Sequence, residues 1–419
     1  MNNANNSNGF YQQQEQWYAD GVALTDIAQQ YGTPCYVYSQ TAFVSAYQRL
    51  KTTFCHSCPQ LCYAVKANDN IALLRLLAEQ GAGFDIVSAG ELQRVLLAGA
   101  EAANIVFSGV GKSSKEIDTA LNAGIGCFNV ESEEELARIE QRAAASDRTA
   151  PIALRLTLDI DGVTHRHLTT GLVGGKFGVS AADGQRLARV AAHSSHLQFL
   201  GFSCHVGSQI VDEQIYLRLA RAMAEQVTLA EENGIAVQRV DMGGGFGVDY
   251  QQINPPLMPL AEYDRALAAH FSEHHLIIEP GRYIAAAAGV LLTTVEYVKT
   301  SADKTIWVVD AGMHTLLRPA LYDAVHPTLP LQNSSAATQT GDVVGPICES
   351  ADILARDLQL ALTAGEYVGI FNAGAYGMVM ANNYNTQPRP GIVLTANGKW
   401  QQIRRRETLA DMLMFETDV

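Results

Sequence analysis

Three groups of residues have the types and spacing that chemistry needs, and each directly follows a short apolar run. The first is Lys66 in "YAVKAN", the second is the glycine-rich "DMGGGFG" at 241–247, and the third is Glu279 with Arg282 in "IIEPGRY". Lysine is seldom fully buried without a partner. Lys66 therefore either caps a strand end in solvent or serves as a chemical handle, an amine that can bind a carbonyl group covalently.

Each feature also has a structural interpretation. Glycine-rich turns are common, and this one matches neither the dinucleotide-binding pattern nor the P-loop, although glycines let backbone N–H groups approach a phosphate. Glu279 and Arg282 would form a surface ion pair of little value, unless Arg282 grips a carboxylate or phosphate. His205, in "SCHVGSQ", is either a structural histidine or an aromatic face for a planar cofactor.

Together, an amine, a phosphate cradle, a carboxylate and an aromatic face fit one cofactor, pyridoxal 5'-phosphate. A lysine holds this cofactor covalently, and an acidic partner keeps its pyridine nitrogen protonated so that the ring accepts electrons. We therefore interpret Lys66, His205, the glycine-rich turn and Glu279 as parts of one cofactor site.

Such a site needs a scaffold that gathers strand ends, and the sequence from about 60 to 280 predicts one. Apolar runs alternate there with amphipathic stretches. Ser88, Ser113 and Ser132 each precede a glutamate by three residues, which predicts a capping box and a helix start at each. The eight runs are "QLCYAVKA", "GAGFDIV", "NIVFS", "GCFNVE", "PIALRLT", "LQFLGFSCH", "AVQRVDMGG" and "HLIIEP".

Strands that alternate with helices pair in parallel through right-handed crossovers. Eight such units indicate an α/β protein with a (β/α)8 TIM-like barrel, and a doubly wound open sheet is the alternative. In such a barrel the chemistry lies at the C-terminal strand ends. The residues expected there are Lys66, Asp85, Ser108, Arg155, His205, Gly243 to Gly245 and Glu279.

After about residue 285 the pattern changes to strand-like runs separated by Gly, Asn or Pro. Strands without intervening helices predict a separate β-rich domain, a β-barrel or sandwich. The run "GTPCYVYS" precedes the barrel and is expected to join that domain, which would make it discontinuous. The predicted organisation is 1–40 as an N-terminal segment of the β domain, 41–284 as the pyridoxal-phosphate-binding barrel and 285–419 as the C-terminal β-rich domain.

The bulk composition narrows the classes of protein. The chain has 419 residues and a net charge of −14, which argues against nucleic acid as a partner. No apolar run approaches the about 20 residues that span a membrane. The N-terminus lacks the basic flank and apolar core of a signal peptide, and its first residues are expected to be disordered. Seven cysteines, an odd number without an export signal, fit a cytoplasmic location.

One cysteine-rich stretch contains residue types that can bind a metal. "CHSCPQLC" offers Cys55, His56, Cys58 and Cys62, but no second CxxC or HxH pair completes a tetrahedral zinc site. We therefore expect incidental thiols and no metal.

Eight motifs follow one another along the chain: "YAVKAN", "FDIVSAGEL", "CHVGSQI", "DMGGGFG", "EPGRY", "LLRPALYDAVHP", "VGPICESAD" and "NAGAYGMVMANNYNTQPRP". With these motifs, and over nearly its whole length, the chain resembles the alanine-racemase-type (fold type III) pyridoxal-phosphate enzymes and, among them, the diaminopimelate decarboxylases. The chain departs from the family pattern after the arginine of strand five, where the family has Asn and Pro and this chain has Thr157 and Leu158.

The resemblance implies a role for each site residue. Lys66 binds the cofactor covalently, His205 stacks on its ring and Glu279 pairs with the pyridine nitrogen. The phosphate is held by Ser208, Gly244, Gly245 and the backbone of Gly281 and Arg282, with Tyr376 nearby. The residues that contact the substrate are Arg282, Arg318, Tyr322, Glu349 and Tyr376. Cys348 and Glu349 reach in from the partner subunit of a homodimer with shared active sites.

The substrate follows from charge. Diaminopimelate carries an ammonium and a carboxylate at its far end, which suit Glu349 and the two arginines, whereas arginines would repel the distal ammonium of ornithine. The expected reaction is decarboxylation of meso-diaminopimelate to L-lysine and CO2, the last step of lysine biosynthesis. Either Cys348 or Lys66 returns the proton, and without the resemblance Cys348 reads as a structural thiol.

Alternative functions stay open. They are a decarboxylase of another basic amino acid, of the ornithine, arginine or carboxynorspermidine type, a racemase on the same architecture, and a non-catalytic relative that binds pyridoxal phosphate.

Overall fold

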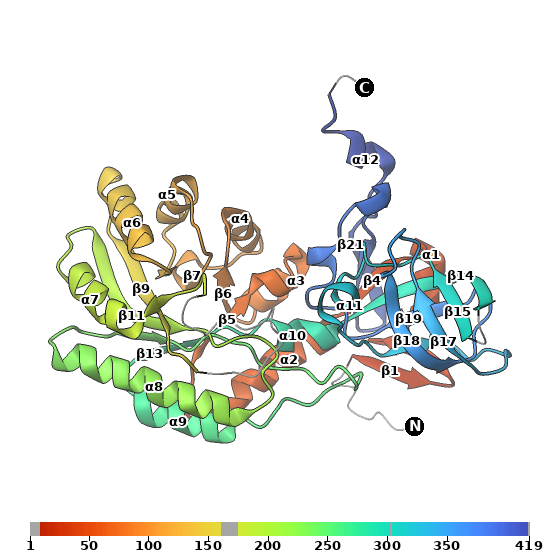
Figure 1. Ribbon diagram of the computed structural model, residues 1–419, viewed down its shortest axis with the longest axis horizontal. Helices are drawn as coiled ribbons and strands as arrows, with labels where there is room; N and C mark the ends of the chain where they lie inside the picture. Colours follow the sequence, from red (N-terminus) through yellow and green to blue (C-terminus); the bar gives the residue numbers. More distant parts are fainter. Residues whose placement is uncertain (1–8, 161–174, 302–303, 418–419) are drawn as a thin grey trace. The chain divides into compact units, whose positions relative to one another are not determined.

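The computed structural model describes residues 9–160, 175–301 and 304–417. The N-terminal residues expected to be disordered, 1–8, lie outside these ranges, as do residues 161–174. Thr157 and Leu158, where the chain departs from the family pattern, lie at the end of the first described range. The chain divides into two compact units (Figure 1), which we call the barrel unit and the β unit. The barrel unit is Tyr47–Val248 with Leu257–Tyr283, and the β unit is Met1–Ala46, Asp249–Pro256 and Ile284–Val419.

All eight predicted strands form and pair in parallel as a closed sheet. The order around it is β5, β6, β7, β8, β9, β11, β12 and β13, and β13 pairs again with β5. Their bounds are β5 Gln60–Ala64, β6 Gly83–Ile86, β7 Ile105–Phe107, β8 Cys127–Val130, β9 Ala150–Thr157, β11 Leu197–Cys204, β12 Arg239–Asp241 and β13 His275–Ile278; a short β10, Val179–Ser180, pairs with β9 beside the ring. The predicted TIM-like barrel is confirmed. An open doubly wound sheet, whose two edge strands would lack a second neighbour, is wrong.

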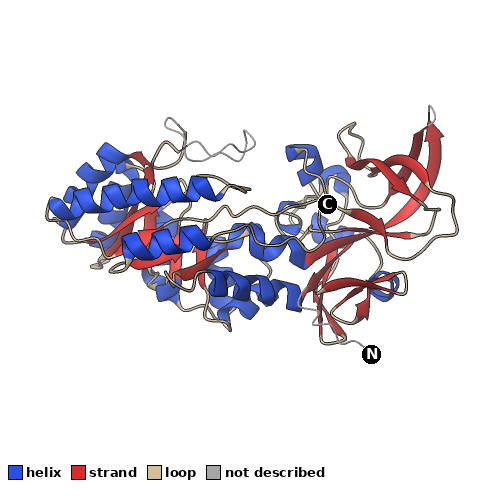
Figure 2. Cartoon of the chain, turned by 90° about the horizontal axis from the view of Figure 1, so that it is seen from below, coloured by secondary structure: helices blue, strands red, loops and turns tan. Residues whose placement is uncertain are grey.

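Helices follow the strands and cover the outside of the barrel (Figure 2). Each presents an apolar face inward, as α4 does with Leu92 and Val95. The bounds are α2 Gln40–Thr53, α3 Ile71–Ala78, α4 Ala89–Leu97, α5 Ser114–Ala123, α6 Glu133–Ala145, α7 Ala181–Ala192, α8 Glu213–Glu232, α9 Ala261–Phe271 and α10 Arg282–Ala285. Short 3-10 turns are η1 Val65–Ala67, η2 Ala102–Asn104 and η3 Ala286–Ala288.

The three predicted helix starts are confirmed. Ser88, Ser113 and Ser132 each accept a hydrogen bond from the backbone N–H three residues later. Only the Ser113 cap is reciprocal. In the other two helices the glutamate bonds the backbone N–H of the residue before the cap. Those carboxylates therefore tie the helix to the end of the preceding strand.

The β unit is built mainly from antiparallel strands. One sheet has the order β18–β17–β15–β14–β4–β20–β21, with β19 pairing to β14 and β16, and a small sheet has the order β1–β2–β3. The strands are β1 Phe10–Gln13, β2 Gln16–Ala19, β3 Val22–Ala23, β4 Cys35–Ser39, β14 Gly289–Ser301, β15 Lys304–Val309, β16 Thr328–Pro330, β17 Gln339–Val344, β18 Ile353–Leu360, β19 Tyr367–Ile370, β20 Gly391–Ala396 and β21 Lys399–Arg404. The helices are α1 Leu24–Tyr31, α11 Arg318–Tyr322 and α12 Leu409–Leu413, with the 3-10 turns η4 Met378–Met380 and η5 Tyr384–Thr386.

Strand β4 shows that the β unit is discontinuous, as predicted. It lies inside the sheet, antiparallel to β14 and parallel to β20. Its Val37 packs in one apolar core with Phe10, Val290, Phe371 and Val393. The N-terminal segment is therefore part of the core of this unit and not an appendage. Across the described ranges, no helix is both long enough and apolar enough to cross a membrane.

Candidate active site

Lys66 lies in η1, immediately after β5, and its partner is a buried carboxylate. Its Nζ is 2.8 Å from Oδ2 of Asp85, and the lysine side chain is 36% exposed while the aspartate is fully buried. The register of β5 and β6 places Ala64 opposite Asp85, which brings the following lysine within reach. Lys66 is thus an accessible amine held at a strand end by an anion, and not a solvated cap.

A second group of carboxylates lies where two separate pairs of adjacent strands end, β7 with β8 and β12 with β13. Asn129 on β8 donates to Asp241 Oδ2 at 3.1 Å and to Ser108 Oγ at 3.0 Å. The Ser108 hydroxyl in turn donates to Glu279 Oε1 at 3.3 Å. Asp241 and Glu279 are hydrogen-bonded to each other as well. Side chains from four strand ends therefore form one buried polar network.

The electrostatics of this network favour a shared proton. Burial raises the pKa of Glu279 well above its usual value, the charges of Asp241 and Asp85 raise it further, and Lys66 opposes them. Burial likewise raises the pKa of Asp241, against the hydrogen bond from Glu279. A cation brought beside Glu279 would reverse this balance and favour the ionised carboxylate.

The glycine-rich turn brings its backbone close to these groups. Gly243 and Gly245 have left-handed backbones, with φ of +63° and +91°. A Cβ on Gly244 would lie 2.0 Å from the carbonyl oxygen of Glu279. Only glycine fits there without a shift of the backbone, so Gly243 to Gly245 present no side chain that would keep a phosphate away from this turn.

His205 follows β11, and the same turn orients it. The Gly244 N–H donates to His205 Nδ1 at 3.2 Å. Burial lowers the pKa of His205 well below its usual value, and the charges of Arg155 and Lys66 lower it further. The ring is therefore neutral near pH 7 and carries its proton on Nε2, as a flat stacking surface would require.

Ser208 and Arg282 lie together. The Arg282 Nη2 donates to Ser208 Oγ at 2.9 Å, and a Cβ on Gly281 would lie 3.0 Å from Cβ of Ala64. The predicted residues of the barrel unit thus follow β11, β12, β13 and β5, which are consecutive around the ring.

The remaining predicted residues belong to the β unit. Arg318 is buried at the start of α11, and its Nη1 donates to His326 Nε2 at 2.8 Å. Its guanidinium also lies over the Tyr250 ring, 4.3 Å from the centroid. His326 donates through Nδ1 to the Phe371 carbonyl at 3.0 Å. Tyr322 ends the same short helix and is half-buried.

Cys348 and Glu349 are exposed between β17 and β18. The Cys348 N–H donates to Asn385 Oδ1 at 3.3 Å, and the Tyr384 hydroxyl donates to the Glu349 carboxylate. Tyr376 is half-buried and has a left-handed backbone, with φ of +55°. The structure therefore places the predicted residues in two sets, one on each unit.

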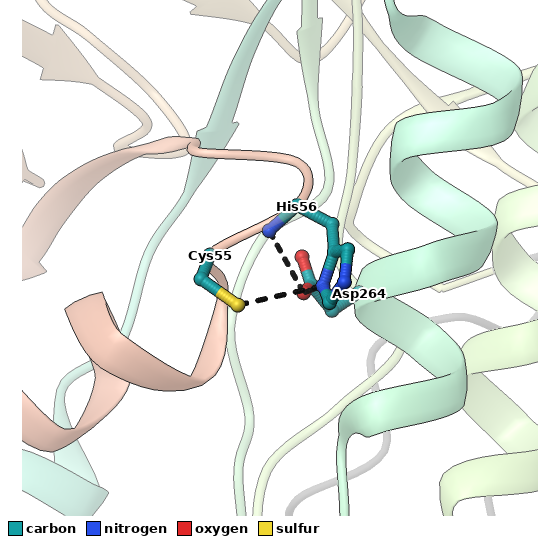
Figure 3. A group of neighbouring side chains, drawn as sticks. All are labelled: Cys55, His56 and Asp264. Carbon is teal, nitrogen blue, oxygen red and sulfur yellow. Dashed lines mark hydrogen bonds and ion pairs between the residues drawn. The ribbon is translucent and has the colours of Figure 1, made fainter.

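The cysteine-rich stretch is explained by structure. Cys62 lies buried within β5, whereas Cys55 and Cys58 are exposed. Cys55, His56 and Asp264 do lie together (Figure 3). However, the Asp264 carboxylate already accepts four hydrogen bonds, from the backbone N–H groups and the side chains of His56 and Ser57. The cluster thus anchors the turn after α2 to α9.

Several residues of these networks were not assigned from the sequence. The sequence indicates no role for Asp241, and it does not reveal that Arg155 pairs with Glu131, 2.6 Å away. The others are Asn129, Lys112 and Glu135 on the barrel, and Tyr250, His326, Tyr384 and Asn385 on the β unit. Their only signal was position, since Asn129 lies at a strand end and Tyr384 and Asn385 lie in a motif of the resemblance.

Comparison with known proteins identifies the family. Residues 41–286 match the pyridoxal binding domain of the pyridoxal-dependent decarboxylases. The chain is 43% identical to diaminopimelate decarboxylase of Neisseria meningitidis serogroup B, over 95% of this chain and 96% of the relative. The chain belongs to the diaminopimelate decarboxylase family.

Solved structures of the diaminopimelate decarboxylase family agree. The enzyme from Helicobacter pylori complexed with L-lysine is 37% identical, with a TM-score of 0.89 over 93% of this chain and 98% of that one. The enzyme from M. jannaschii in co-complex with L-lysine is 32% identical, with a TM-score of 0.89 over 99% and 98%.

Pyridoxal phosphate is the cofactor of this family, and the residues present fit it. The fit rests on the accessible Lys66 amine, on a glycine-rich turn without side chains that would keep a phosphate away, and on buried acid. Asp85 Oδ1 is buried and makes no hydrogen bond within the described residues, so the site carries anionic capacity that a cationic ring would use.

Proposed function

We propose that the protein decarboxylates meso-diaminopimelate to L-lysine and CO2, the last step of lysine biosynthesis. One observation carries the proposal. In a chain of this family, the accessible Lys66 amine lies at the same barrel end as the buried Glu279–Asp241 pair. An amine that can hold the cofactor and an acid that can stabilise a positive ring nitrogen are the two groups this reaction needs.

When bound, pyridoxal phosphate supplies an electron sink for the carbon that loses CO2. The residues of the chain do the rest. Lys66 holds the cofactor, Glu279 stabilises positive charge at the ring nitrogen, and the neutral His205 lies against the ring. The phosphate is bound by Ser208, by Gly244 and Gly245, and by the backbone of Gly281 and Arg282.

The β unit supplies the groups for the substrate in this proposal. Arg318 is a buried, oriented cation suited to the distal carboxylate, and Glu349 is an anion suited to the distal ammonium. Tyr322 and Tyr376, and Arg282 of the barrel unit, also contact the substrate in this proposal. Cys348 returns the proton, with Lys66 as the alternative donor. Seven free cysteines support the proposal that the protein works in the cytoplasm.

The direct test is release of CO2 by the holoenzyme. We expect turnover of meso-diaminopimelate and at least about 100-fold lower kcat/KM for L-ornithine and L-arginine, since each lacks the distal carboxylate that Arg318 would pair with. Equal or faster release from ornithine would favour the alternative decarboxylase. Racemisation without CO2 release would favour the racemase, and visible cofactor absorbance without any turnover would favour the non-catalytic relative.

We further infer a homodimer with shared active sites, in which Cys348 and Glu349 of one subunit complete the site of the other. Their exposure on the β unit supports this, because residues that reach another subunit must lie at the surface. A twofold dimer repeats such a contact twice.

Subunit exchange tests the shared site. Lys66→Ala and Cys348→Ala are each inactive in this proposal, but their heterodimer has one site with both lesions and one with neither. Random pairing should therefore restore about a quarter of wild-type activity. No recovery, with exchange shown independently by mass, would mean that each chain builds its own site. A Cys348→Ala variant that is active by itself would indicate that Lys66, and not Cys348, returns the proton.

A further inference from the structure

Tyr384 and Asn385, which are adjacent in η5, form hydrogen bonds with the loop between β17 and β18. Their partners there, Glu349 and Cys348, are adjacent as well. The Cys348 N–H donates to the side-chain oxygen of Asn385 at 3.3 Å, and the Tyr384 hydroxyl donates to the carboxylate of Glu349. All four residues are exposed, so neither loop is fixed by burial in an apolar core. These polar contacts therefore set where the Cys348 backbone and the Glu349 carboxylate lie.

The base of the Cys348 loop is held separately. Asp352 is buried and accepts from the Ile347 N–H at 2.7 Å, while the Gly345 N–H donates to the Asp352 carbonyl at 3.0 Å. Gly345 packs against this carboxylate so closely that a Cβ would lie 2.4 Å from it. The ends of the loop are thus held by hydrogen bonds, and at its exposed tip the Glu349 N–H donates to the Ile347 carbonyl at 2.8 Å. The Asn385 and Tyr384 contacts add a hold on Cys348 and Glu349 from outside the loop.

The loop that carries Tyr384 and Asn385 has an unfavourable backbone. Asn385 and Thr386 both have left-handed φ, +54° and +57°. Asparagine tolerates that region, but a β-branched threonine does so only when its surroundings impose it. Something outside η5 must therefore hold this loop.

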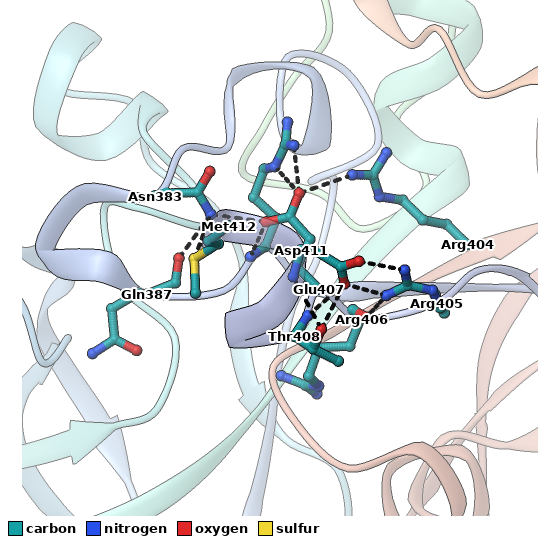
Figure 4. A network of polar contacts seen from close by, with 10 residues as sticks. Asn383, Gln387, Arg404, Arg405, Arg406, Glu407, Thr408, Asp411 and Met412 are labelled. Atoms are coloured by element: carbon teal, nitrogen blue, oxygen red, sulfur yellow. Dashed lines mark hydrogen bonds and ion pairs between the residues drawn. The ribbon is translucent and has the colours of Figure 1, made fainter. Parts of the chain in front are cut away.

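Glu407 supplies that constraint (Figure 4). Its carboxylate accepts from Asn383 Nδ2 at 2.8 Å, from the Arg389 N–H at 3.0 Å and from Arg389 Nε at 2.6 Å. Burial opposes ionisation of this carboxyl, but the hydrogen bonds from Arg389 and Asn383 prevail and lower its pKa to about 2. Glu407 thus stays ionised and bridges the two ends of the Tyr384 loop.

We propose that Tyr384 and Asn385 are positioning residues for decarboxylation, with Tyr384 orienting Glu349 for the substrate and Asn385 fixing the backbone of Cys348. The inference rests on the proposed function, because it takes Glu349 as a substrate ligand and Cys348 as the proton donor. It adds that these two roles are set separately, by two adjacent side chains of one loop that Glu407 anchors.

The two positioning contacts predict effects on two different kinetic constants, KM for Tyr384 and kcat for Asn385. Tyr384→Phe removes one hydroxyl and frees the Glu349 carboxylate, so KM for meso-diaminopimelate should rise about tenfold while kcat changes less than twofold. Asn385→Gly keeps the left-handed backbone but removes the acceptor for Cys348, so kcat should fall about tenfold with little change in KM. Tenfold is the size expected from one lost hydrogen bond of this kind. Asn385→Asp, which keeps an acceptor oxygen, should restore most of kcat.

Matched controls lie elsewhere in the same unit. Asn397 is exposed and also left-handed, with φ of +50°, and Tyr297 is exposed on β14. Asn397→Gly and Tyr297→Phe should leave both constants unchanged.

Hydrogen–deuterium exchange of residues 345–352 gives a readout that does not need turnover. In the holoenzyme, Asn385→Gly should speed exchange of this peptide at least fivefold, and Asn397→Gly should not. The inference is overturned if exchange is unchanged in Asn385→Gly, or if both variants alter kcat and KM in the same proportion. A wild-type protein that releases no CO2 from meso-diaminopimelate would contradict the proposed function, and the exchange result would still judge the contact between the two loops.

Discussion

Replacing Lys66 with alanine is expected to lower kcat by about 10³-fold or more and to remove the visible absorbance of the bound cofactor. Losses of this size are usual when a covalent catalytic group is removed. The alanine also leaves Asp85 buried without the cation now 2.8 Å away. The variant should therefore unfold at a lower temperature than wild type, because a buried charge that loses its partner is costly.

Lys66→Arg separates these two effects. Arginine keeps a positive charge for Asp85 but does not give up its proton, so it cannot bind a carbonyl carbon. Its turnover and visible absorbance should be lost as in the alanine variant, while its unfolding temperature should lie closer to wild type. Turnover by either variant within about tenfold of wild type would contradict the role of Lys66.

Glu279→Gln is expected to leave the cofactor bound and to lower kcat by about 10²-fold, the size typical of losing one electrostatic catalytic partner. Glutamine has nearly the same shape and can still accept from Ser108, which now donates to Glu279 at 3.3 Å. What it cannot do is carry the negative charge that holds a proton on the ring nitrogen. Single-turnover assays with cofactor content measured in parallel distinguish slow chemistry from poor loading.

Glu279→Asp is the matched variant, because it keeps the charge and shortens the side chain. It should retain more activity than the glutamine variant. If the two variants lose activity equally, the position of the side chain and not its charge sets the rate. A kcat of Glu279→Gln within twofold of wild type would contradict the pairing of Glu279 with the ring nitrogen.

The barrel was predictable because its strands are short, mainly apolar runs, such as the Ile105–Phe107 run that became β7, with helix caps between them. A buried parallel strand can be recognised from its own apolar residues, without knowing which strands pair with it. Ser88 and Ser132 predicted helix starts correctly. They did not predict that Glu91 and Glu135 would bond one residue further back, because that choice depends on how the strand turns into the helix.

The site was predictable only where a residue is chemically unusual for its place, as Lys66 and Glu279 are at strand ends. The role of Asn129 could not be predicted, because asparagine at a strand end is ordinary. This role depends on a hydrogen bond to Asp241, which lies within reach only when the ring of strands closes. The roles of Tyr384 and Asn385 could not be predicted, because no repeating pattern in a sequence indicates which loops contact each other. Their importance appears only when the hydrogen bonds to Glu349 and Cys348 are seen.

Strand β4 has a consequence for synthesis on the ribosome. It is made early, yet its two neighbours are β14, which begins at Gly289, and β20, which ends at Ala396. Both of its edges therefore stay open while the whole barrel emerges, and an open edge is a template for pairing with other chains. A nascent chain released before β20 leaves β4 with one edge unpaired, so premature termination in the last part of the gene yields an aggregating product even though every barrel strand has been made.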